Sequence, residues 1–114
     1  MKVAIIGSRS LEIENIESYI PKECTEIVSG GAIGVDTCAA SFARRHKIKL
    51  TEFLPEYEKY GRAAPIVRNK MIVEYSDTVI VFWDGKSKGT LFVINYCESM
   101  GKECRVINLS SSRI

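Results

Sequence analysis

The sequence predicts a doubly wound α/β fold in which a five-stranded parallel sheet lies between two layers of helices. Short apolar runs alternate with helix-like stretches along the whole chain, and glycine-marked turns follow three of the apolar runs. No linker, repeat or low-complexity segment interrupts this pattern. With 114 residues and 46% apolar side chains, the chain can bury a real core, so we expect one domain over residues 1–114.

Five apolar segments are expected to form the strands of this sheet. The run from Thr78 to Trp83 is continuous and apolar, as a strand buried on both faces should be. The expected strands cover residues 2–7, 25–29, 48–53, 78–83 and 104–109.

About four helices are expected between these strands. Pro21 would close the first, Pro65 suits the first turn of the third, and Gly101 suits the position after the fourth. We expect residues 55–63 to form a polar loop and residues 110–112 a frayed tail. The expected helices cover residues 11–20, 34–46, 64–75 and 88–100. Alternation of this kind predicts a Rossmann-like three-layer sandwich.

Three glycine-marked turns, each placed directly after an expected strand, are the most informative feature of the chain. In doubly wound sheets, ligands bind beyond the carboxyl ends of the strands. Glycine lets backbone N–H groups approach a ligand, and the helix that follows directs its positive dipole end to the same place. Together the turns predict a site for a phosphate-bearing ligand. They are Gly7-Ser8-Arg9, Ser29-Gly30-Gly31-Ala32-Ile33-Gly34-Val35-Asp36 and Asp84-Gly85-Lys86-Ser87-Lys88-Gly89-Thr90.

Several side chains in or near these turns are candidate ligand contacts. The guanidinium groups of Arg9 and Arg68 suit phosphate, although Arg9 could also be an ordinary surface residue. Asp36 could accept a hydrogen bond from a ribose hydroxyl or only complement the helix dipole. The Thr90 hydroxyl could meet a second phosphate or a ribose. Arg62 and Asn69, like Arg68, flank the start of the third expected helix.

Known phosphate-binding and catalytic patterns are missing from the sequence. Neither the dinucleotide pattern G-x-G-x-x-G nor a P-loop ending in Gly-Lys-Ser/Thr is present. The single histidine, His46, stands far from the glycine turns, so no Ser–His–Asp or Cys–His arrangement is supported. Tyr57 and Tyr60 could stack on a base or pack over their own loop.

The net charge and the cysteine content limit the partners, metals and cofactors that we expect. The net charge of +2 does not call for nucleic acid or a membrane, and no apolar run approaches the ~20 residues of a membrane span. The four cysteines form no C-x-x-C pair, so we expect reduced structural thiols, no metal and no cofactor. With no signal-peptide pattern at the N-terminus, the expected location is the cytoplasm.

Four motifs in this order resemble the SLOG superfamily, which links DNA-processing-protein-A-like proteins to the Lonely Guy phosphoribohydrolases. The resemblance covers nearly the whole chain, from Gly7 to Asn108, and it is closest to a small bacterial and phage branch. The motifs are Gly7-Ser8-Arg9, the segment from Gly30 to Asp36, the segment from Tyr60 to Asn69, and the turn from Gly85 to Thr90.

The resemblance implies nucleotide chemistry, but this sequence differs from the Lonely Guy enzymes at one point. In Lonely Guy enzymes, an arginine and a glutamate release the base from a nucleoside monophosphate. Arg68 matches the arginine, whereas the positions of the glutamates hold Phe92 and Val93. Without that carboxylate, cleavage would need a substitute such as Asp36, Asp84 or Glu56.

The leading hypothesis is therefore a nucleotide-binding sensor or carrier rather than a robust catalyst. The second is a phosphoribohydrolase-like enzyme, and the third is a module for single-stranded DNA, which relatives of the DNA-processing-protein-A type bind. The family also implies a homo-oligomer, and the apolar fourth helix, residues 91–96, is compatible with one.

Overall fold

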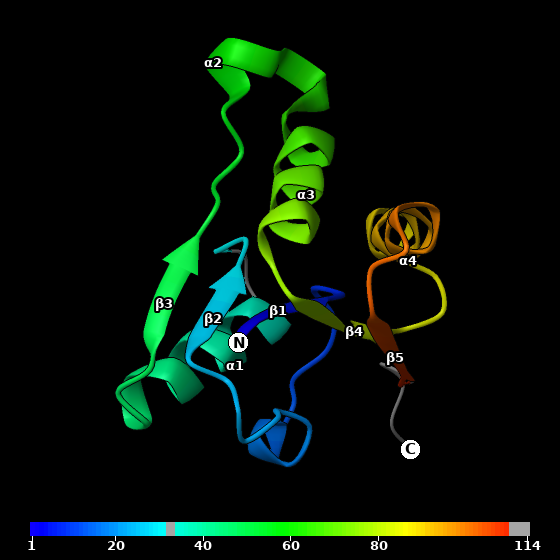
Figure 1. Cartoon of the computed structure of the whole chain (residues 1–114). Coiled ribbons are helices and arrows are strands. Elements are labelled where there is room, and N and C mark those ends of the chain that lie inside the picture. The colour runs from blue at the N-terminus through cyan, green and yellow to red at the C-terminus, as the bar shows by residue number, and fades with distance from the viewer. Residues whose placement is uncertain (32–33, 110–114) are drawn as a thin grey trace.

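The computed structural model describes residues 1–31 and 34–109, and it has the expected doubly wound α/β architecture (Figure 1). The strands are β1 (Lys2–Gly7), β2 (Glu26–Ser29), β3 (Lys49–Glu52), β4 (Thr78–Trp83) and β5 (Cys104–Asn108). All of them pair in parallel, in the order β3-β2-β1-β4-β5. The predicted strand bounds differ from these by one residue at most.

Helices lie on both faces of this sheet. The helices are α1 (Val35–Arg45), α2 (Tyr57–Tyr60), α3 (Ala64–Tyr75) and α4 (Lys88–Met100), with 3₁₀ turns η1 (Ile16–Ser18) and η2 (Gly61–Ala63). α3 and α4 contact each other on one face, and α1 lies on the other (Figure 1). The bounds of α1, α3 and α4 agree closely with the predictions.

The alternation of side chains along β1 divides the core into two parts. Val3 and Ile5 face α1 and pack with Phe42 of that helix. Ala4 and Ile6 point the other way and pack with residues of α3 and α4 such as Ile72. Because successive side chains of a strand point to opposite faces, one central strand supplies both cores.

The predicted helix over residues 11–20 is wrong, because this segment forms only turns around η1. Leu11 and Ile16 are both buried against the α1 face, at 4% and 1% exposure. Positions five residues apart lie about 140° apart around a helix, so a helix could not bury both side chains. Isoleucines at positions 13, 16 and 20 further lower the helix propensity.

The predicted loop over residues 55–63 is also wrong. It contains α2 and η2, which lead directly into α3. The Glu56 carbonyl accepts hydrogen bonds from the N–H groups of Lys59 and Tyr60, which closes one helical turn. No proline or β-branched residue follows Pro55 in this segment, and the only glycine there, Gly61, stands directly after the α2 turn. The predicted tail at 110–112 lies outside the described residues.

The strand order fixes where a ligand site can form. The chain moves from β1 outward to β3, then returns to the other side of β1 to form β4. The order therefore reverses between β1 and β4. The η1 turn that follows β1 packs on the α1 face, and α4, which follows β4, packs on the opposite face. This reversal opens a crevice at the carboxyl ends of β1 and β4.

Candidate functional site

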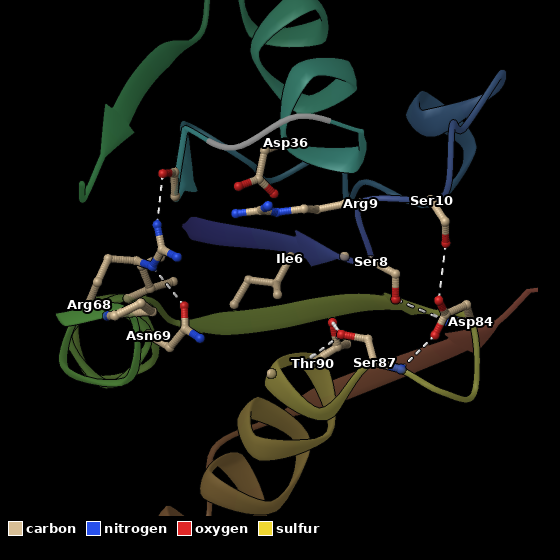
Figure 2. A pocket seen from close by; sticks show the side chains of 15 residues that line it. Ile6, Ser8, Arg9, Ser10, Asp36, Arg68, Asn69, Asp84, Ser87 and Thr90 are labelled. Carbon is tan, nitrogen blue, oxygen red and sulfur yellow. Dashed lines mark hydrogen bonds between the residues drawn. The ribbon is translucent and has the colours of Figure 1, made fainter. Parts of the chain in front are cut away.

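A cleft of about 400 Å³ lies at this switch point, at the carboxyl edge of the sheet. Its size falls within the range of roughly 300–1,000 Å³ typical of small-molecule sites. Figure 2 shows its lining side chains, which come from the end of β1, the β2–α1 turn, α3 and the β4–α4 turn. The lining residues are Ile6, Gly7, Ser8, Arg9, Ser10, Gly30, Asp36, Pro65, Arg68, Asn69, Ile72, Asp84, Ser87, Gly89 and Thr90.

Most of the predicted site residues meet in this cleft, but some do not. Those that line it are Gly7, Ser8, Arg9, Gly30, Asp36, Arg68, Asn69, Asp84, Gly89 and Thr90. Those that do not line it are Ser29, Gly31, Gly34, Arg62 and Gly85. Ala32 lies outside the described residues.

Two of the residues outside the lining shape the cleft indirectly. Ser29 is fully buried, and its hydroxyl accepts a hydrogen bond from the Gly31 N–H at 3.2 Å, which holds the turn after β2. Gly34 has φ +78° and lies against the backbone of Arg9, where a Cβ atom would approach the Arg9 carbonyl oxygen to 2.7 Å. Glycine at this position therefore lets the β1 turn rest against the start of α1.

Gly7 brings β1 and α1 together at the wall of the cleft. A Cβ atom on Gly7 would lie 2.8 Å from Cγ1 of Val35, and closer still to the other methyl group. Val35 is the first residue of α1 and is fully buried. The missing side chain at Gly7 thus lets the N-terminus of α1 approach the end of β1.

One end of the cleft, here called the Arg68 end, contains Gly30, Asp36, Arg68 and Asn69. Arg68 Nη1 donates to the Gly30 carbonyl at 2.9 Å and to the Phe53 carbonyl at 3.4 Å, while Nε donates to Asn69 Oδ1 at 2.8 Å. The half-buried guanidinium therefore connects the β2–α1 turn, the end of β3 and α3.

Charged groups surround the Arg68 guanidinium. Burial lowers the pKa of Arg68, the Asp36 carboxylate opposes that shift, and the nearby Arg9 adds to it. Arginine keeps its charge despite such shifts. Figure 2 shows the Arg9 guanidinium and the Asp36 carboxylate pointing into the same part of the cleft. Asp36 lies in the first turn of α1 and is 8% exposed, and its carboxylate lies near the guanidinium groups of Arg68 and Arg9.

The other end, here called the α4 end, contains Ser8, Asp84, Ser87 and Thr90. Asp84 Oδ1 accepts hydrogen bonds from the N–H groups of Lys86 and Ser87, both at 2.8 Å. Its Oδ2 accepts from the Ser10 hydroxyl at 3.0 Å. The two backbone N–H donors are the main reason why the pKa of Asp84 falls from 3.8 to about 2.

Hydroxyl groups complete the α4 end. The Ser8 hydroxyl accepts from the Asp84 N–H at 3.2 Å, and the Ser87 side chain caps α4 by accepting from the Thr90 N–H. Ser8 and Thr90 are 2% and 5% exposed. With the Asp84 carboxylate already engaged by the turn, this end presents mainly hydroxyl groups and the N-terminus of α4 to the cleft.

Several other candidate residues lie outside the cleft lining. Tyr57, Tyr60 and Glu56 do not line the cleft, and Tyr57 is 60% exposed. Among the described residues, the carboxylates that line the cleft are Asp36 and Asp84. No group of three or more His, Cys, Asp or Glu residues in the described part of the chain is arranged to hold a metal ion.

Sequence reasoning missed five lining residues, Ile6, Ser10, Pro65, Ile72 and Ser87. Ser87 carried a usable signal, because serine directly before a helix is a preferred N-cap. Ile6 and Ile72 form part of the apolar floor beside the core. Their sequence pattern is that of ordinary core residues, so only the tertiary arrangement identifies them.

The fold and the cleft define a doubly wound α/β protein with a small-molecule-sized site at its switch point. A comparison of the sequence with known protein families and with curated proteins finds no match. The resemblance to the SLOG superfamily therefore stays a prediction. Among the described residues, no helix combines the length and apolar character that crossing a membrane requires.

Proposed function

We propose that this protein binds a nucleotide or a nucleotide-derived phosphate ligand in the cleft, as a sensor or carrier. The observation that carries the proposal is the pair of guanidinium groups, Arg9 and Arg68, that face one cleft beside the first turns of α1 and α4. Guanidinium groups offer several N–H donors and positive charge, which suit the oxygen atoms of a phosphate. Helix N-termini favour the same kind of ligand.

A thermal-shift screen tests this proposal. The panel contains AMP, ADP, ATP, cyclic nucleotides, dinucleotides, NAD and ADP-ribose. A ligand at ~100 times its dissociation constant adds about 2.7 kcal/mol to the free energy of unfolding, which raises the melting temperature by roughly 10 °C. Absence of a shift with every member of the panel would contradict the proposal.

Arg9→Ala locates the binding event. Arg9 is exposed, so its removal should leave the fold intact while weakening the affinity for the ligand found in the screen by about 10-fold. Arg44→Ala is the matched control, because Arg44 is also exposed but belongs to the last turn of α1. Equal affinities of the two variants would place the ligand outside the cleft.

A phosphoribohydrolase-like activity is the second candidate function. The position of the Asp36 carboxylate in the cleft favours it. This carboxylate lines the cleft next to Arg68. Incubation with purified nucleotides, followed by chromatography for free base, tests the activity, and Asp36→Asn should abolish any base release. No base above the blank across the panel would exclude this candidate.

Binding of single-stranded DNA receives less support. Such binding uses aromatic side chains on which bases stack along a basic groove. The tyrosines of α2 lie outside the cleft lining, and the cleft itself combines two cations with two carboxylates.

A cytoplasmic location fits the four free thiols at Cys24, Cys38, Cys97 and Cys104.

A further inference from the structure

The contact between Arg68 and Asn69 fixes the orientation of the Asn69 amide. Arg68 Nε can only donate a hydrogen bond, and it meets the end of the Asn69 side chain at 2.8 Å. The atom at that end must therefore be the acceptor, Oδ1. The NH₂ group, Nδ2, is the other end of the amide, and Figure 2 shows it pointing away from Arg68.

The same contacts limit what Arg68 itself can offer to a ligand. Nε is engaged by Asn69, and Nη1 is engaged by the carbonyl groups of Gly30 and Phe53. Within the part of the chain that the structure describes, these bonds leave Nη2 as the nitrogen available for a ligand. Arg68 thus cannot present two nitrogens side by side to an anion, as an unrestrained guanidinium does.

We propose that Asn69 determines the specificity of the cleft for an anionic group through two different atoms. Oδ1 holds the Arg68 guanidinium in place, and Nδ2 donates a hydrogen bond to another oxygen atom of the anionic group that Arg68 Nη2 contacts. The ligand group is a phosphate or another oxyanion with at least two acceptor oxygens. This inference rests on the proposed function, because it assigns the anion of that ligand to the Arg68 end.

Asn69→Asp separates the two tasks of Asn69. Aspartate has nearly the same shape and still offers an oxygen to Arg68 Nε, so the guanidinium should stay in place. It replaces the NH₂ donor by a carboxylate oxygen, which repels an anion. The lost donor and the added negative charge both act against an anion held at this point, so we expect the affinity for AMP, used as the probe, to fall by about 10- to 100-fold.

Two further variants complete the design. Asn69→Ala removes both atoms, so it should lower the AMP affinity and also expose the Arg68 Nε–H group to faster hydrogen exchange in NMR spectra. Asn95→Asp is the matched control, because it makes the same chemical change at an exposed position of α4 that does not line the cleft. Its AMP affinity should stay within about twofold of the wild type.

The outcomes separate this inference from the proposed function. If the wild type binds AMP and Asn69→Asp binds it equally well, the donor role of Asn69 is overturned while the proposed function stands. If the Arg68 Nε–H signal exchanges at the same rate in Asn69→Ala, the positioning role is overturned, whatever the ligand. If the wild type fails to bind AMP and every other nucleotide of the panel, the proposed function fails and the donor role fails with it.

Discussion

At the α4 end of the cleft, most hydrogen bonds join residues that are close in the sequence, whereas at the Arg68 end two of the three Arg68 hydrogen bonds reach distant segments. Asp84 binds the N–H group of Ser87 three residues later, and Ser87 in turn caps the N–H group of Thr90. Arg68 instead reaches the carbonyl of Gly30, 38 residues earlier in the chain. One end is therefore a local turn and helix cap, and the other depends on the packing of α3 against the sheet.

The two ends of the cleft should therefore respond differently to changes elsewhere in the molecule. Apart from the bonds of Ser8 and Ser10 to Asp84, the α4 end is set by its own turn sequence, so it should change less when other parts of the molecule change. The Arg68 end unites the β2–α1 turn, the residue after β3 and α3, so its geometry should respond to changes in any of them. Three substitutions and one change of pH test this difference between the two ends. The largest effect is expected for the first of them.

Gly7→Ala should damage both ends at once, because Gly7 belongs to the wall that they share. The new methyl group would overlap the buried Val35 side chain, and α1 would have to move away from β1. We expect a loss of about 3 kcal/mol in the free energy of unfolding, measured by urea denaturation. Gly89→Ala is the matched control, because a Cβ atom there meets no atom within 4 Å. Equal stabilities of the two variants would show that β1 and α1 are not in close contact.

Arg68→Met should affect mainly the Arg68 end. It removes the donors for the Gly30 and Phe53 carbonyls and one of the cations near Asp36. Because Arg68 is half-buried, we expect a loss of about 2 kcal/mol in urea denaturation. Arg62→Met serves as the control, since Arg62 is exposed and lies outside the cleft lining. A similar loss in both variants would contradict the special role of Arg68.

Ser87→Ala should weaken only the α4 end. The hydroxyl that accepts from the Thr90 N–H is lost, which typically costs about 1 kcal/mol of stability. The comparison predicts that NMR signals at the Arg68 end stay unchanged. Ser99→Ala, near the end of α4, removes a hydroxyl that bonds to the Tyr96 carbonyl and should be nearly neutral. Widespread signal changes in Ser87→Ala would show that the two ends are coupled.

Acid should release the Asp84 turn, with the smallest effect of the four. The folded pKa of Asp84 is lowered from 3.8 to about 2, mainly by the N–H groups of Ser87 and Lys86. A lowered pKa stabilises the folded state above the unfolded value, and this contribution is lost as the pH falls from about 4 to about 2. The stability difference between the wild type and Asp84→Asn should therefore be constant above pH 5 and shrink in that interval. A difference that does not change with pH would contradict the role of the charge.

The same contrast separates what could be predicted from what could not. The strands, α1, α3 and α4 follow from apolar runs and helix-ending residues, which act over a few positions. The segment 11–20 was mispredicted because Leu11 and Ile16 are placed by the core they enter rather than by helical spacing. Arg62 was expected at the site and lies outside the cleft lining, since its sequence position next to the motif says nothing about the direction of its side chain.

The sequence by itself determined the parallel α/β alternation and the glycine turns at the carboxyl ends of the strands, because these depend on local side-chain patterns and backbone freedom. It also selected Arg68 and Asp36 as site residues. Only the tertiary structure decided that Arg68 is tied to Gly30 and Asn69, that Asp84 is engaged by its own turn, and that Ile6 and Ile72 form part of the floor. These facts depend on contacts between segments far apart in the chain, whose distances are set by the packing of helices on the sheet.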